Sequence, residues 1–92
     1  MDVTYRIDKD ILYIAVEGRI DASNAAQAEE KIFNIKNDNP GKYIVLDADK
    51  LEYISSAGLR VILRLRKEEP KLAIINVASD VYEVFDMTGF TD

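Results

Sequence analysis

The chain has 92 residues, with 17 acidic and 12 basic side chains and a formal net charge of −5, and it contains neither cysteine nor histidine. The negative balance argues against a nucleic-acid-binding function, which needs a basic surface. The two missing residue types exclude disulfides, thiolate nucleophiles, the usual structural zinc sites and the commonest general base. We therefore expect a protein that is not an enzyme and that needs neither a metal nor a cofactor.

Length and composition predict one soluble globular domain over residues 1–92, since the hydrophobic fraction is 48% and the charged fraction is 32%. No apolar run approaches the roughly 20 residues that a membrane-spanning helix needs. Residues 1–6 lack the basic start and apolar core of a signal peptide. We expect a cytoplasmic protein with no direct membrane binding.

The first part of the chain predicts a β-hairpin followed by a helix. Residues 3–7 alternate between apolar and polar and indicate a half-buried strand, and residues 11–17 indicate a second strand after a polar turn. Either Asp21 or Ser23 can cap a helix that runs to about Lys36. The core side of this helix is predicted to be the apolar stripe Ala25, Ala28, Ile32 and Ile35.

The middle of the chain predicts a buried strand and a second helix. After a break rich in Asn, Pro and Gly, the continuous apolar run 43–46 indicates a strand in the middle of a sheet, covered on both faces. Residues 51–54 then lead into Ser55 and Ser56, either of which can cap a helix over about 57–69. The serine that does not cap would lie on the exposed first turn, where the helix dipole favours a phosphate.

This second helix is predicted to bury Leu59, Ile62 and Leu63, with Val61 and Leu65 at the margins. Another face is basic and indicates either a solvated surface or a docking surface for an acidic partner. It consists of Arg60, Arg64 and Lys67.

The last part of the chain predicts a strand over 72–77 and a final helix that Ser79 caps and Gly89 ends. The apolar stripe of that helix is predicted to be Val81, Val84, Phe85 and Thr88. The order strand, strand, helix, strand, helix, strand, helix predicts an α/β fold. Its sheet should be mostly parallel, with an antiparallel hairpin at the N-terminal end.

Four motifs, in this order, resemble the STAS domain family, and most closely its small free-standing members, the bacterial anti-sigma factor antagonists. They are residues 18–21, 44–47, 53–59 and 81–90, which read GRID, IVLD, YISSAGL and VYEVFDMTGF. The resemblance implies the STAS fold, a four- to five-stranded mixed sheet with an N-terminal antiparallel hairpin and three or more amphipathic helices packed on it.

In that family the loop before the second helix commonly reads Asp-Ser-Ser-Gly and its first serine accepts phosphate, which implies that Ser56 is the acceptor here. Ser55 stands where the family often has aspartate and is the alternative acceptor. The resemblance also implies a partner-binding surface around this loop. Its predicted members are Asp21, Asp47, Ser55, Ser56, Ala57, Gly58, Leu59 and Arg60. Without the family, Ser55, Ser56 and Asp21 would be helix caps, Asp47 a strand end and Gly58 a packing residue.

The resemblance further implies a partner-switching cycle in transcription regulation. The unphosphorylated antagonist, a monomer or weak dimer, would bind an anti-sigma factor that is also a serine kinase, so that a sigma factor is released. Phosphorylation would end this binding, and a metal-dependent serine phosphatase would reset the protein. Two other readings keep the fold. One is a phospho-switched regulator of secretion, motility or second-messenger signalling, and the other is a constitutive subunit of a membrane transport complex.

Overall fold

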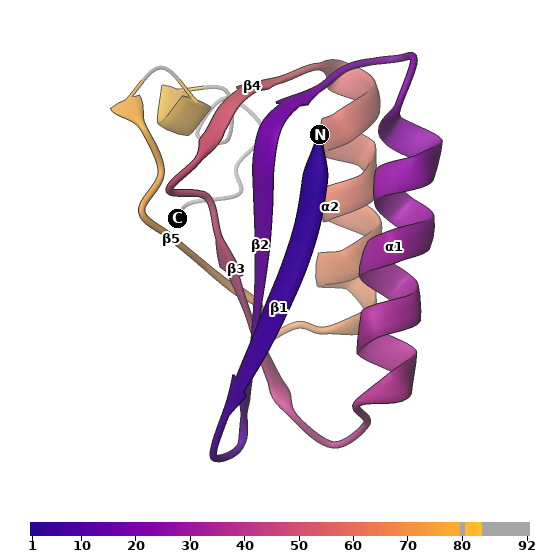
Figure 1. Cartoon of the computed structure of the whole chain (residues 1–92), viewed down its shortest axis with the longest axis vertical. Coiled ribbons are helices and arrows are strands. Elements are labelled where there is room, and N and C mark those ends of the chain that lie inside the picture. The colour runs from indigo at the N-terminus through magenta and orange to yellow at the C-terminus, as the bar shows by residue number, and fades with distance from the viewer. Residues whose placement is uncertain (80, 84–92) are drawn as a thin grey trace.

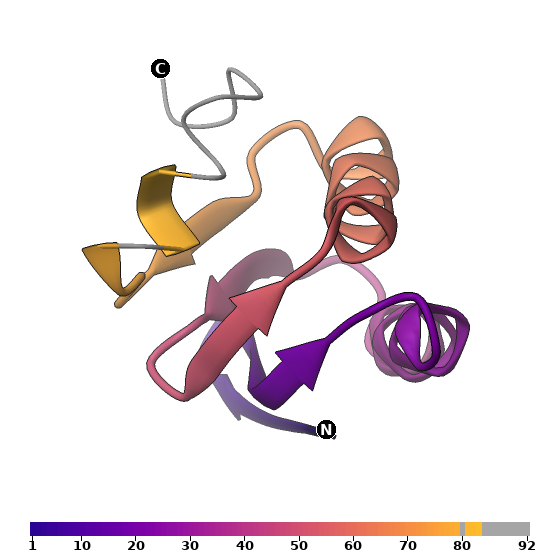
Figure 2. The same cartoon turned by 90° about the horizontal axis from the view of Figure 1, so that it is seen from above.

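A computed structural model describes residues 1–79 and 81–83 and shows a mixed five-stranded sheet with two long helices side by side on one face (Figures 1 and 2). The elements are β1 (Asp2–Asp8), β2 (Ile11–Ile20), α1 (Ala25–Asp38), β3 (Tyr43–Asp47), β4 (Leu51–Ile54), α2 (Ser56–Glu68) and β5 (Ala73–Ile75). The predicted α/β fold is confirmed. No helix in the described part of the chain has the length and apolar character that crossing a bilayer requires.

β2 is the strand around which the sheet is arranged. It pairs antiparallel with β1 along the whole hairpin, parallel with β3 through Ile11–Ala15, and parallel with β4 through Gly18–Ile20. β3 also pairs in parallel with β5. The antiparallel hairpin at the N-terminal end is confirmed. Residues 51–54, which the sequence indicated only as an approach to the loop, form a strand of their own.

Gly18 lets β2 change partners between its two halves. Its φ of +91° lies in a region that side-chain-bearing residues rarely adopt, and the pairing register shifts between Gly18 and Arg19. The Gly18 N–H donates to the Lys50 carbonyl at 2.8 Å, which starts the pairing with β4. The last residue of β2, Ile20, therefore lies beside Ile54 at the end of β4.

The strands and α1 bury the apolar sets that the sequence predicted. Alternate residues of β2 turn toward the helices, and the α1 stripe is confirmed except that Ile35 is only partly buried. The buried members of these elements are Leu12, Ile14, Val16, Ala25, Ala28 and Ile32. Only one face of β3 is fully covered, because Tyr43 is 55% exposed and both long helices lie on the other side. The expectation that both faces of β3 are covered is therefore wrong.

α1 begins at Ala25, and neither Asp21 nor Ser23 caps it. The preceding residue is Asn24, whose side chain accepts from the Asp21 N–H and donates to the Arg19 carbonyl, each at 2.9 Å. The Asp21 carboxylate is occupied by Ser23 instead of by the helix. The Asp21 contribution to α1 is its backbone carbonyl, which accepts from the Ala25 N–H at 3.0 Å.

The buried face of α2 is rotated from the prediction. Val61 and Leu65 are 1% and 0% exposed, whereas Leu63 is 39% exposed. The reason is that α2 packs against both the sheet and α1, so its core seam follows the spacing i, i+3, i+4 and i+7. That seam consists of Gly58, Val61, Ile62 and Leu65.

The basic face of α2 is exposed, as predicted, and one of its members joins the two long helices. Arg64 donates from two of its nitrogens to the two carboxylate oxygens of Glu29 on α1. A second bridge runs from Lys36 Nζ on α1 to Glu68 Oε1, one helical turn after Arg64 at the C-terminal end of α2, at 3.2 Å. These contacts hold the outer sides of the two helices together.

Ser79 is itself helical, because the Tyr82 N–H donates to the Ala78 carbonyl at 2.7 Å. The predicted cap at Ser79 is therefore wrong, since Ala78 precedes the first helical residue. Val81 is buried, as predicted. The other predicted residues of this helix lie outside the described residues. They are Val84, Phe85, Thr88 and Gly89.

Gly58 lies where α2 meets the ends of β2 and β4, and no larger residue fits there. A Cβ atom at this position would lie 2.7 Å from Ile54 Cγ1 and 2.8 Å from Ile20 Cγ2. Both isoleucines are themselves buried in a closely packed core and cannot simply turn away. The missing side chain therefore sets how closely α2 approaches the sheet.

We expect Gly58→Ala to lower the free energy of unfolding by up to about 2 kcal/mol. Overpacking a core costs about 1–3 kcal/mol, and the better helix propensity of alanine returns only about 1 kcal/mol. Urea unfolding of Gly58→Ala, Ile54→Ala and the double variant measures this. The double variant should lose less than the sum of the two single variants, because truncation of Ile54 removes the closest clash. A stabilised Gly58→Ala protein would contradict this packing argument.

Candidate functional site

The two serines at the start of α2 have different environments. Ser55 is the residue that caps the helix, with extended backbone angles of φ −87° and ψ 175°, and its Oγ accepts from the Gly58 N–H at 3.2 Å. The Ser55 N–H donates to the Ile20 carbonyl at 2.8 Å, and its own carbonyl accepts from the Leu59 N–H at 2.9 Å. Ser55 is therefore held by both the sheet and the helix.

Ser56 is the first residue of α2, and it is exposed. Its hydroxyl makes no hydrogen bond with any residue that the structure describes. The first turn of α2 carries no acidic residue, so the positive end of the helix dipole is not already neutralised there. This is the one of the two hydroxyls that an enzyme or a partner can reach without breaking the cap.

The remaining α2 residues of the predicted partner-binding surface are either buried beneath the loop or exposed to solvent. Gly58 and Leu59 are buried beneath the loop, and Ala57 is partly buried. Arg60 is exposed one helical turn after Ser56, and its side chain has no partner among the described residues. Ser56 and Arg60 are thus the members of the predicted set that α2 presents to solvent.

Asp21 lies beside this loop, because it directly follows Ile20, the residue to which Ser55 is hydrogen-bonded. Hydrogen bonds from the hydroxyl and the N–H of Ser23 hold the pKa of the Asp21 carboxyl below its ordinary value. Asp21 is therefore ionised at neutral pH and places a negative charge at the rim of the loop.

Asp47 is not brought to the loop. It pairs with Ala15 of β2, and the six residues from Ala15 to Asp21 span roughly 20 Å of strand. Its side chain lies on the face of the sheet away from the helices, where it accepts from the Asp49 N–H at 3.0 Å and from Asn76 Nδ2 at 3.1 Å. The structure thus gives Asp47 a role in joining the ends of β3 and β5, and its part in partner binding stays a prediction.

Two residues near the loop were not among the predicted members of the surface. Arg19 and Tyr53 are opposite each other in the β2–β4 pair, and the Arg19 guanidinium lies 4.4 Å from the centre of the Tyr53 ring. Tyr53 is 41% exposed. Part of this contact could be found in the sequence, because Arg19 and Tyr53 each occupy the position before the last residue of a strand. The sequence did not predict that these two strands pair with each other.

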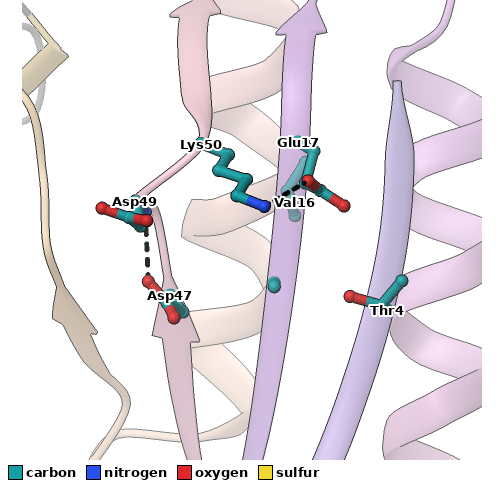
Figure 3. Close-up of a pocket in the computed structure, with 7 residues that line it drawn as sticks. Thr4, Val16, Glu17, Asp47, Asp49 and Lys50 are labelled. Carbon is teal, nitrogen blue, oxygen red and sulfur yellow. Dashed lines mark hydrogen bonds and ion pairs between the residues drawn. The ribbon is translucent and has the colours of Figure 1, made fainter.

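The open face of the sheet carries a hollow of about 200 Å³ (Figure 3). Its lining includes Thr4, Ala15, Glu17, Asp47, Asp49 and Lys50. Lys50 Nζ lies 3.5 Å from Glu17 Oε1, which offsets part of the acidic charge. Among the described residues no three potential metal ligands gather at one point. The hollow therefore offers polar groups but no arrangement that would fix a metal ion.

Comparisons with known proteins agree on one family. The model of the STAS domain matches residues 2–92. A Bordetella bronchiseptica protein named as an anti-sigma factor antagonist, BtrV, is 36% identical over 84 residues, which span 87% of this chain and 72% of that protein. The anti-sigma-B factor antagonist of Listeria monocytogenes is 28% identical over 91 residues, which span 92% of this chain and 77% of that protein.

Solved structures show the same fold. The anti-sigma factor antagonist from Mycobacterium paratuberculosis superposes with a TM-score of 0.84 at 20% identity, covering 96% of this chain and 77% of that one. Unphosphorylated SpoIIAA, also an anti-sigma factor antagonist, superposes with a TM-score of 0.76 at 19% identity, covering 97% and 82%. With a family model that matches nearly the whole chain, the protein belongs to the STAS domain family.

Proposed function

We propose that this chain is an anti-sigma factor antagonist that acts in the cytoplasm and is switched by phosphorylation of Ser56. The names of its relatives in Bordetella and Listeria support this role. The observation that supports this switch is the difference in environment between the two serines. Ser55 is occupied as the cap of α2, and Ser56 is exposed on the first turn, where its hydroxyl has no hydrogen-bond partner among the described residues.

In this proposal the unphosphorylated form binds an anti-sigma factor that is also a serine kinase, and the sigma factor is released. The kinase transfers the γ-phosphoryl group of ATP to the Ser56 hydroxyl, which loses its proton, and the complex dissociates. A metal-dependent serine phosphatase hydrolyses the phosphoserine and restores the first form. The chain is the substrate of both reactions and catalyses neither.

A phosphate on Ser56 would change the surface more than the fold. It adds about −1.5 to −2 charges and three strong acceptors. The positive end of the α2 dipole and the guanidinium of Arg60, four residues on, would favour that charge within the free protein. A partner that covers Ser56 would have to desolvate the same dianion without a matching cation, which weakens the complex.

We expect Ser56→Asp to weaken binding to the partner kinase by roughly 30-fold or more, since loss of one central interface contact costs about 2 kcal/mol. Ser56→Ala should bind like the parent protein and should not be labelled by the kinase with ATP. Isothermal titration and intact mass after incubation with kinase and ATP measure both properties. Equal binding of the two variants, together with labelling of Ser56→Ala, would refute the assignment.

Ser55→Ala is the matched control, because it removes the neighbouring hydroxyl. Loss of an N-cap costs about 0.5–2 kcal/mol, so this variant should unfold at lower denaturant concentration. Its Ser56 should still accept phosphate. Ser56→Ala should show the reverse pattern, with nearly unchanged stability and no phosphate. A Ser55→Ala protein that is as stable as the parent and is not phosphorylated would show that Ser55 is the phosphate acceptor and not the cap.

A further inference from the structure

β1 is an edge strand whose outer side is unpaired in the described part of the chain. It is the outermost strand of the sheet, and no described element lies beyond it (Figure 2). Its seven residues pair with β2 without a break, and its sequence DVTYRID contains no proline, glycine, lysine or bulge. Proline, lysine and bulges usually protect an edge from pairing with another strand, as do charged side chains, of which β1 carries Asp2, Arg6 and Asp8.

The register of the hairpin shows which backbone groups of β1 point outward. The carbonyl of Asp10 accepts from the Tyr43 N–H, and the N–H of Gly18 donates to the Lys50 carbonyl. The backbone N–H and C=O groups of even-numbered residues of β2 therefore point toward β3 and β4. The backbone groups of odd-numbered residues of β2 therefore point toward β1, and they are hydrogen-bonded to the even-numbered residues of β1. The outward N–H and C=O groups are those of Val3, Tyr5 and Ile7.

The outward residues also carry apolar side chains that the fold leaves uncovered. Tyr5 is 53% exposed and Ile7 is 45% exposed, although both lie on the face of the sheet that the helices pack against. The other face of β1 carries Asp2, Thr4 and Arg6, all exposed. An added strand would thus meet an apolar row on one face and a charged row on the other.

We infer that β1 pairs antiparallel with β1 of a second copy of this chain, with Thr4 opposite Thr4 at the two-fold axis. In this register Val3 faces Tyr5 of the other copy and exchanges hydrogen bonds with it. Asp2 faces Arg6 of the other copy, so two opposite-charge pairs form about the axis. Centring the pair on Tyr5 would place Asp2 against Asp8 twice, which like-charge repulsion disfavours.

Charge reversal tests the pairing and its register together. Asp2→Arg alone or Arg6→Asp alone turns both attractive pairs into repulsive ones, and each should weaken self-association roughly tenfold or more. An equimolar mixture of the two variants should associate again, because each repulsive pair becomes an attractive one between unlike copies. The double variant Asp2→Arg/Arg6→Asp should associate like the parent. Sedimentation equilibrium at up to about 1 mM protein measures the parent and these four samples, as small interfaces give weak dimers.

A cysteine placed on the axis gives an independent readout, since the chain has none of its own. The two Thr4 residues would form a pair without hydrogen bonds, whose Cα atoms lie about 4.5 Å apart, within the range of a disulfide. Thr4→Cys should form an intermolecular disulfide on mild oxidation at least tenfold faster than Ala15→Cys. Ala15 is the matched control, because it is the β2 partner of Thr4 and lies one strand in from the edge.

Urea unfolding of each variant shows whether β1 still folds, which matters most for Arg6→Asp, because the Arg6 guanidinium lies 3.9 Å from the centre of the Tyr13 ring in the same chain. The inference fails if the parent protein sediments as a monomer at every concentration. It also fails if charge reversal leaves a dimer unaffected or if the two cysteine variants oxidise at the same rate. It does not depend on the proposed phosphorylation, because neither test involves Ser56 or a partner protein.

Discussion

The close approach of α2 to the ends of β2 and β4 is the contact on which the rest of this structure depends. Gly58 allows it by having no side chain, and the hydrogen bond from Ser55 N–H to the Ile20 carbonyl ties the start of the helix to the sheet. The second contact defines where Ser55 must sit, and that position gives it the extended backbone of a cap. Which serine caps and which is exposed is therefore decided by the sheet, through β2.

This support explains how a modification could act locally. Ser55, Gly58 and Leu59 hold the first turn from beneath, while Ser56 and Arg60 lie on its outer side. A charge added at Ser56 meets solvent, a cation one turn away and the positive end of the helix dipole, which favour it, whereas the Asp21 carboxylate at the rim of the loop carries a charge of the same sign. The energetic consequence falls on whatever covers that surface. A small domain can in this way change the charge of its surface without rearranging any residue of its core.

Much of the fold could be predicted from the sequence because the strands and α1 carry clear periodicity. The misplaced residues depended on contacts between elements. Leu63 and Val61 exchanged places because the phase of α2 is set by its packing against α1 as well as the sheet. Asp47 was expected near the loop because of the family resemblance, but β3 pairs with the first half of β2 and β4 with the second, so the strand ends are not level. Both serines had the chemistry of a cap, and only the pairing of Ser55 with Ile20 distinguishes them.

β2 also separates the two surfaces to which we assign partners. The loop with Ser56 follows β4, on one side of β2, and the free edge of β1 lies on the other side. A second copy paired along β1 would extend the sheet away from β4, at the edge opposite the strand that leads into the first turn of α2. Self-association and partner binding would then compete for no residue. Phosphorylation at Ser56 would then act on one surface without changing the other, because Ser56 takes no part in the pairing along β1.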